Sequence, residues 1–227
     1  MKKVEELPVI QGVIFDMDGL MFDTERLGME AWGDQSALRG YTFTSDVGKA
    51  IRGRNDADIR EILKDLYSPE LDYTDLRDHV RAQMDERIAA EGVPVKPGLY
   101  ELLKWLKENN IPRALASSSR RTTVETRCRM AGIWEDFDAV VCGDMVKHSK
   151  PEPDIFLRAA REIGTQPEHT MVLEDSFNGI RAGHAGNFIT VMVPDLDEPT
   201  PEIDELYTAK AKSLNEVLAR LQADEWE

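Results

Sequence analysis

Short apolar segments rich in β-branched residues alternate with segments of helical periodicity along most of this chain. Such alternation is typical of an α/β fold, in which helices join parallel strands and cover both faces of the sheet. It therefore predicts a doubly wound parallel sheet, a Rossmann-like core. Strands are expected at 9–15, 111–116, 139–142, 170–173 and 188–193, and helices at about 99–109, 122–132, 153–164, from 176 onward and at 213–221.

One long stretch in the first half of the chain breaks this alternation. Its apolar residues follow helical spacing, and no convincing strand is visible there. We therefore predict a helical insert over 23–94, within an α/β core formed by 1–22 and 95–227. Its expected helix ends are a cap at Asn55 and stops at Gly40 and Gly92.

The composition limits the possible functions. The chain has 227 residues, with 28 basic and 43 acidic side chains and a net charge of −15 at pH 7. Such a surface repels nucleic acid and anionic membranes, so we expect neither as a partner, and no obligate protein partner is predicted. The apolar runs are too short to span a bilayer, and the N-terminus lacks the apolar core of a secretory signal. Cys128 and Cys142 are not at metal-ligand spacing, so we expect reduced, buried cysteines in a cytoplasmic protein.

Polar residues collect where the predicted strands end. In doubly wound sheets, ligands bind outside the carboxyl ends of the strands. These ends and the loops after them carry four carboxylates, a hydroxyl and a lysine: Asp16, Asp18, Glu174, Asp175, Ser117 and Lys150. Four carboxylates in one place repel one another unless a cation lies between them. The sequence therefore predicts a divalent ion with oxygen ligands, and Mg²⁺ suits a carboxylate site that keeps positions open for water and phosphate.

Four sequence motifs occur at these strand ends. They are FDMDGLMFDTE (15–25), ALASSS (114–119), SKPEPDIF (149–156) and LEDSFNGIRAG (173–183). Together, and in this order, they resemble the four motifs of the haloacid dehalogenase-like phosphohydrolase superfamily. The helical insert resembles the four-helix cap of the branch that contains β-phosphoglucomutase and small sugar-phosphate phosphatases. The resemblance implies a phosphoric monoester hydrolase that uses Mg²⁺.

The resemblance also implies a chemical role for the matching residues. Asp16 attacks phosphorus and forms an aspartyl-phosphate, which splits one displacement into two. Asp18 is the general acid for the leaving oxygen and then the base for water. Lys150 supplies positive charge to the phosphoryl group and to Asp16. Ser117 and the amide of Ser118 bind phosphoryl oxygens, helped by the following helix N-terminus.

The metal is expected to be held by both acidic motifs. Asp16 and Asp175 contribute side chains, Asp18 contributes its backbone carbonyl, and Glu174 stands beside Asp175. Gly19 allows the sharp turn that brings both carboxylates of the first motif to the pocket.

Several of these residues also have a simpler interpretation. The serines at 117–119 or the acidic pair at 174–175 can serve as helix caps, and Lys150 can be an exposed surface residue. Arg54, in the basic loop 52–55 of the insert, is expected to bind substrate, and the alternative is a plain connection between helices. Asp23 is expected either at a hinge or in contact with substrate.

The expected activity is a Mg²⁺-dependent phosphatase of small phosphorylated metabolites, in particular sugar phosphates. The alternative enzyme is β-phosphoglucomutase, whose cap carries a histidine where this chain has Gly28. It also carries an arginine where this chain has Asp56, or Arg54 after a shift of two residues. A haloacid dehalogenase is disfavoured because that activity lacks the partner at Asp18. A phosphate-binding protein with an inactive site would be expected to lack Asp16 or Asp18, and both are present.

Overall fold

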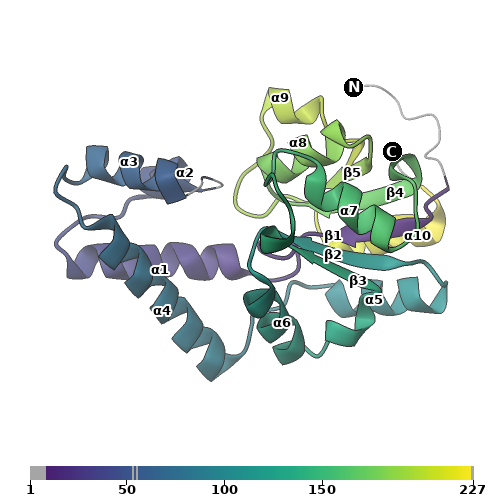
Figure 1. Ribbon diagram of the computed structural model, residues 1–227, viewed down its shortest axis with the longest axis horizontal. Helices are drawn as coiled ribbons and strands as arrows, with labels where there is room; N and C mark the ends of the chain where they lie inside the picture. The colour runs from purple at the N-terminus through teal and green to yellow at the C-terminus, as the bar shows by residue number, and fades with distance from the viewer. Residues whose placement is uncertain (1–8, 53, 55, 226–227) are drawn as a thin grey trace. The chain divides into compact units, whose positions relative to one another are not determined.

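The computed structural model describes residues 9–52, 54 and 56–225 (Figure 1). Its internal contacts divide the chain into two compact units, one formed by Met1–Asp23 with Pro94–Glu227 and the other by Thr24–Val93. The second unit differs from the predicted insert, 23–94, by one residue at each end.

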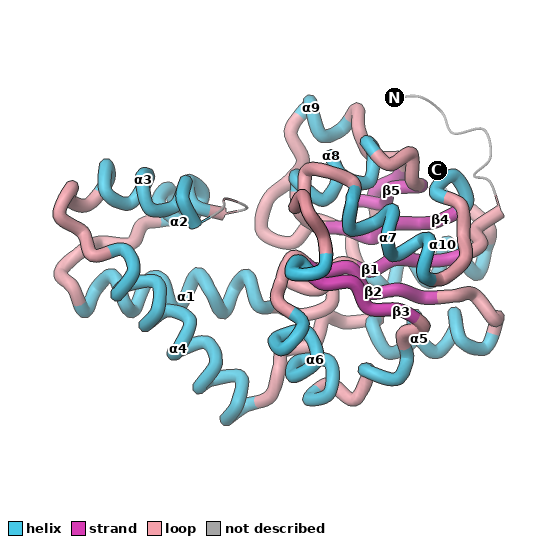
Figure 2. The backbone as a smooth tube through the Cα atoms, viewed as in Figure 1, coloured by secondary structure: helices cyan, strands magenta, loops and turns pink. Residues whose placement is uncertain are grey.

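The first unit is built on a parallel sheet with the strand order β3-β2-β1-β4-β5-β6 (Figure 2). β1 lies in the middle and pairs with β2 on one side and β4 on the other. Every residue of β1, β2, β4 and β5 is buried, so both faces of the sheet are covered, and the predicted doubly wound parallel sheet is confirmed. The strands are β1 Gly12–Phe15, β2 Arg113–Ser117, β3 Ala139–Cys142, β4 Thr170–Glu174, β5 Ile189–Met192 and β6 Ala209–Lys210.

Helices follow the strands and pack on the sheet. α7 packs against β1, β2 and β3, α8 packs against β4 and β5, and α5 and α10 pack against each other. The regular apolar spacing of α5 buries its four leucines, as expected for a helix that covers a sheet. The helices are α5 Leu99–Glu108, α6 Arg121–Met130, α7 Asp154–Glu162, α8 Phe177–Ala185, α9 Pro201–Asp204 and α10 Leu214–Ala223, with 3₁₀ turns η1 Trp134–Asp136, η2 Gly143–Met145 and η3 Pro167–His169.

The described part of the second unit contains the four expected helices. They are α1 Thr24–Leu38, α2 Ser45–Ile51, α3 Asp56–Leu66 and α4 Tyr73–Glu91. α1 packs along α4, and in the core of this unit the Trp32 ring stacks on Tyr73 with 6.3 Å between centroids. Gly40 and Gly92 lie just after α1 and α4 with positive φ angles of 80° and 84°, as expected of helix stops. The predicted cap Asn55 lies outside the described residues.

Three segments differ from the sequence-based expectation. The first strand begins at Gly12 rather than Val9, whose side chain is 77% exposed. α9 and β6 were not predicted, because neither is long enough to show a periodic pattern. α9 is held by the fully buried Ile203 and begins after Thr200, whose hydroxyl accepts the amide of Ile203.

Two predictions from composition can be compared with the structure. Cys128 and Cys142 are buried, and neither takes part in a disulfide. In the described ranges, none of the helices combines the length and apolar character needed to cross a lipid bilayer.

Candidate active site

Asp16 is the first residue after the central strand β1, and its side chain is only 11% exposed. The Nζ atom of Lys150 lies 2.5 Å from Asp16 Oδ1 and 2.6 Å from Glu174 Oε1, at the end of the neighbouring strand β4. Lys150 is 6% exposed and also lies over the Phe156 ring, 4.7 Å from its centroid. The alternative in which Lys150 is an exposed surface residue is therefore wrong.

Burial sets the protonation behaviour of this cluster. The pKa of Asp16 is raised to about 7, chiefly by desolvation, with the Lys150 ammonium acting to lower it and the nearby Glu174 and Asp18 charges acting to raise it. Desolvation acts to lower the pKa of Lys150, but the charges of Asp16 and Glu174 outweigh it, so the pKa of Lys150 is raised and the ammonium stays charged. The Lys150 ammonium is thus shared by Asp16 and Glu174, and the cluster carries an excess of negative charge.

A group of three carboxylates in the described ranges has the geometry to hold a metal. Oxygens of Asp16, Glu174 and Asp175 lie within 4.8 Å of one another. The backbone approaches them closely, because a Cβ at Gly19, which has a φ of 86°, would overlap the Asp175 carboxylate. An all-oxygen donor set next to a glycine turn fits a hard divalent cation. The predicted ligation by Asp18 through its backbone carbonyl stays a prediction.

Glu174 also stabilises the start of the helix that follows β4. Its Oε2 atom accepts hydrogen bonds from the backbone N of Ser176 at 2.9 Å and from the Ser176 hydroxyl at 3.0 Å. Ser176 is the N-cap of α8 and accepts the amide of Gly179 at 3.0 Å. A Cβ at Gly179 would overlap the Glu174 carboxylate, so only glycine fits there. Helix capping and contact with Lys150 are therefore combined in one side chain, one oxygen for each.

The Asp18 carboxylate is held by different partners from those of Asp16. Its Oδ1 lies 2.5 Å from Arg127 Nη1, and its Oδ2 accepts the hydroxyl of Ser119 at 3.0 Å. Arg127 lies in α6, near the buried Val124 and Cys128 of the same helix. Neither contact was predicted, although a charged residue three positions after the apolar Val124 was a visible signal.

The loop after β2 presents the predicted phosphate-binding residues. Ser117 is buried, and its Oγ accepts the backbone N of Ser119 at 3.1 Å, while Ser118 is exposed. Gly143 lies against this loop, donating its amide to Ser119 O at 3.0 Å. The alternative in which these serines cap the next helix is wrong, because the N-cap of α6 is Arg120, which makes no side-chain cap. Ser117 instead stabilises the turn of the loop itself.

Comparison with known proteins decides the family. A sequence model of the haloacid dehalogenase-like hydrolases matches residues 10–187. This chain belongs to that family. The chain is 32% identical over 176 residues to a phosphorylated carbohydrates phosphatase of Thermotoga maritima, covering 76% of this chain and 80% of the relative. It is 31% identical to the fructose-1-phosphate phosphatase of Escherichia coli strain K12, covering 80% of this chain and 95% of the relative.

Solved structures agree with the family assignment. A structure titled putative β-phosphoglucomutase from Thermotoga maritima matches with a TM-score of 0.79 and 27% identity, over 94% of this chain and 99% of that one. The fold is therefore that of the β-phosphoglucomutase-like branch, as the motifs predicted. With named phosphatases among its relatives, this hydrolase is a phosphoric monoester hydrolase, and the non-enzymatic alternative is set aside.

Two further residues named by the sequence analysis, Arg54 and Asp23, have contacts of their own. Arg54 belongs to the helical unit, where it is exposed and its backbone N donates to Ile51 O at 3.2 Å, so a role in substrate binding stays a prediction. Asp23 lies in the α/β unit, where its Oδ1 accepts Lys96 Nζ at 2.9 Å. Lys96 also contacts Asp195 Oδ1 at 2.5 Å, and the Asp23 amide donates to Pro94 O. These bonds join the two segments that connect the units, and the choice between a hinge and substrate contact for Asp23 stays a prediction.

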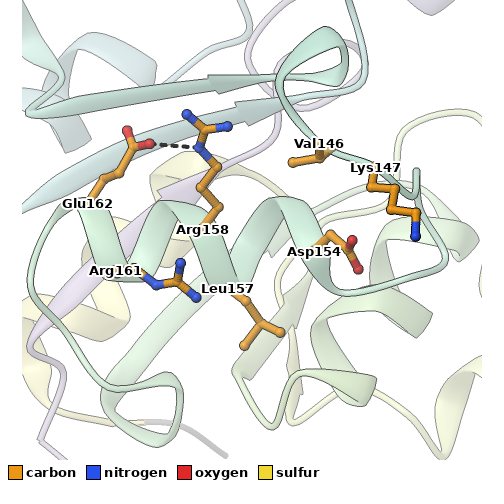
Figure 3. A pocket seen from close by; sticks show the side chains of 7 residues that line it. All are labelled: Val146, Lys147, Asp154, Leu157, Arg158, Arg161 and Glu162. Atoms are coloured by element: carbon orange, nitrogen blue, oxygen red, sulfur yellow. Dashed lines mark hydrogen bonds and ion pairs between the residues drawn. The ribbon is translucent and has the colours of Figure 1, made fainter.

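A surface groove of this hydrolase lies along α7 (Figure 3). Arg158 lines it and donates from Nε to Glu162 Oε1 at 2.8 Å. None of its lining residues belongs to the acidic cluster; they are Val146, Lys147, Asp154, Leu157, Arg158, Arg161 and Glu162.

Proposed function

We propose that this hydrolase is a Mg²⁺-dependent, cytoplasmic phosphatase of small phosphorylated metabolites, with sugar monophosphates as its substrate class and an aspartyl-phosphate at Asp16 as intermediate. The observation that carries this proposal is the buried Asp16 at the end of β1, 2.5 Å from Lys150 and beside two further carboxylates. The relatives named as phosphatases of phosphorylated carbohydrates and of fructose 1-phosphate support the substrate class.

The nucleophilic step begins at Asp16. Lys150 fixes one of its carboxylate oxygens, which orients the other toward an incoming phosphorus atom. Attack forms the bond from Asp16 to phosphorus and breaks the bond to the leaving oxygen, which takes a proton from Asp18. Asp18 then removes a proton from the water that hydrolyses the phospho-enzyme, so one residue serves in both halves of the reaction.

The remaining groups stabilise charge on the phosphoryl oxygens. Lys150, Ser117 and the amide of Ser118 are expected to contact these oxygens. A divalent cation, proposed as Mg²⁺, would be held by Asp16, Asp175, Glu174 and the Asp18 carbonyl, and when bound it would neutralise charge on the phosphoryl group.

A phosphomutase is the second candidate, because a structural neighbour is titled putative β-phosphoglucomutase. A mutase requires a second group that grips phosphate and holds back water. At Gly28 there is no side chain to take part, although a Cβ there would meet nothing closer than Met84 at 3.6 Å. Asp56 is engaged by Arg77, Arg81 and Tyr73, so its charge is compensated and is a weaker argument against a second phosphate than its sequence position suggested.

The two candidates are separated by what accepts the phosphoryl group. We expect steady release of inorganic phosphate from several sugar monophosphates with Mg²⁺, without dependence on an added bisphosphate. We also expect little conversion of β-glucose 1-phosphate to glucose 6-phosphate in a coupled dehydrogenase assay. Rapid isomerisation stimulated by glucose 1,6-bisphosphate, with much slower phosphate release, would establish the mutase instead.

A further inference from the structure

The unexplained feature near the active site is the pair formed by Arg127 and Asp18. Arg127 comes from the middle of α6, and its side chain is 11% exposed, whereas Asp18 is 27% exposed. Each oxygen of the carboxylate has its own donor, Arg127 Nη1 on Oδ1 and the Ser119 hydroxyl on Oδ2. A buried guanidinium needs a partner for its charge, and Asp18 is that partner. Because each carboxylate oxygen is bound by a different donor, the direction of the Asp18 side chain is fixed.

The two donors differ in what they can do when a proton arrives. A guanidinium has five N–H donors and no acceptor, so Arg127 cannot accept a hydrogen bond from a protonated Oδ1 and binds that oxygen most strongly while it is ionised. A hydroxyl is both donor and acceptor, so Ser119 can donate to an ionised Oδ2 or accept from a protonated one by rotation. The two contacts therefore favour a proton on Oδ2 over a proton on Oδ1.

The direction of each oxygen agrees with this distinction. Oδ1 faces α6, while Oδ2 faces Ser119, which follows the predicted phosphate-binding residues Ser117 and Ser118 directly in the loop after β2. Asp16 is meanwhile turned to a separate cation, Lys150. Two different cations therefore hold the two carboxylates of the Asp-Met-Asp motif in different directions.

We propose that Arg127 is a positioning residue that anchors Asp18 through Oδ1 and makes Oδ2 the oxygen that exchanges the proton. This inference rests on the proposed function, in which Asp18 is the general acid and base. In the first half-reaction the proton on Oδ2 passes to the leaving oxygen as its bond to phosphorus breaks and the bond from Asp16 to phosphorus forms. In the second, Oδ2 takes a proton from the attacking water as the phospho-enzyme bond breaks and phosphate leaves.

The test compares leaving groups. An alkoxide leaving group, as in a sugar monophosphate, needs protonation, whereas the phenolate of an aryl phosphate such as p-nitrophenyl phosphate leaves without much help. The value of kcat/KM reports the steps up to release of the leaving group. For Arg127→Gln we expect kcat/KM to fall on the order of 10²-fold for the sugar phosphate. For the aryl phosphate we expect a loss of less than about fivefold.

Arg129→Gln is the matched control. Arg129 is in the same helix, is 54% exposed and pairs with Glu125 at 2.8 Å. Its replacement should therefore leave kcat/KM unchanged for both substrates. Far-UV circular dichroism and thermal unfolding check the fold of each variant. Should Arg127→Gln fail to fold, Arg127→Lys is compared with wild type on the same two substrates. We then expect a smaller loss of kcat/KM, confined to the sugar phosphate. An equal loss on both substrates, or no loss on either, would overturn the proposal.

A double-mutant cycle separates this inference from the proposed function. If Arg127 acts through Asp18, adding Arg127→Gln to Asp18→Asn should change kcat/KM for the sugar phosphate by less than about twofold. Additive losses would show that Arg127 acts by another route and would overturn the inference alone. Full activity of Asp18→Asn on the sugar phosphate would instead remove the acid–base role of Asp18 and with it the proposed mechanism.

Discussion

Asp16 in the α/β unit and Asp56 in the helical unit are both charged residues with several partners, but their surroundings are opposite. Asp16 is 11% exposed and shares a single cation, Lys150, with Glu174. Asp56 is 44% exposed and receives hydrogen bonds from Tyr73 at 3.0 Å and from Arg77 and Arg81, each at 3.1 Å. The Asp16 cluster thus has more carboxylates than cations, whereas Asp56 has two cations for one carboxylate.

The two pKa values follow from this difference. Burial raises the pKa of Asp16 to about 7, despite Lys150. Burial also acts to raise the pKa of Asp56, but the Tyr73 hydrogen bond and the Arg81 and Arg77 charges hold it below its usual value. A carboxylate cluster that its own protein leaves under-compensated is prepared for a metal ion, whereas a fully compensated one is structural.

The largest expected difference between the two aspartates is in turnover. Asp16→Asn keeps the shape but removes the attacking charge, so phosphate release should fall by several orders of magnitude. Asp56→Asn, the matched control, should change turnover by less than about threefold. The measurement is steady-state phosphate release with circular dichroism as the check on folding. Near-normal activity in a folded Asp16→Asn would show that Asp16 is not the nucleophile.

The next prediction concerns the excess of carboxylates over cations at the Asp16 cluster. Chelation by EDTA should abolish phosphate release, and Mg²⁺ should restore it. Asp175→Asn should raise the Mg²⁺ concentration needed for half-maximal activity, because it removes one of the three clustered carboxylates. Activity that persists unchanged in excess chelator would mean that Lys150 alone balances the cluster.

A smaller effect should appear in the pH dependence of stability in metal-free protein. Between about pH 4 and pH 7 the native state keeps a proton on Asp16 that the unfolded chain has lost, so wild-type stability falls as pH rises through this window. Relative to wild type, Asp16→Asn should therefore gain on the order of a few kcal/mol across it in urea unfolding.

Asp56 should show the opposite sign. Its folded pKa lies below the unfolded value of 3.8, so its contribution is present above that value and is lost as pH falls through the folded pKa. Asp56→Asn and wild type should therefore run parallel between pH 4 and pH 7. If both variants behave alike, the contrast in charge balance is wrong.

The smallest effect is expected at the exposed side of the Asp56 cluster. Arg81 is 57% exposed, so Arg81→Met should cost less than about 1 kcal/mol of stability, because water screens the pair and Arg77 and Tyr73 remain. Thermal unfolding at low and high salt is the measurement. A loss of several kcal/mol would show that the cluster depends on every donor rather than on a surplus.

The sequence predicted well those features that follow from periodicity. Asp16 and Glu174 come together because neighbouring parallel strands end at the same edge, and the strand and motif order placed Lys150 beside them. Arg127 and its contact with Asp18 could not be predicted, since the angle at which a helix presents one side chain depends on packing rather than on spacing alone. The two-residue β6 was missed because it carries too little pattern.

For protein engineering, the close packing around Gly179 limits which single substitutions the centre of this site can accept. Any side chain there would displace Glu174, whose two oxygens are already divided between Lys150 and Ser176. A single replacement would thus disturb the lysine, the acidic cluster and the first turn of α8 at the same time. A mutant library that aims at new substrates should keep position 179 constant and place its diversity in loops that do not share these bonds.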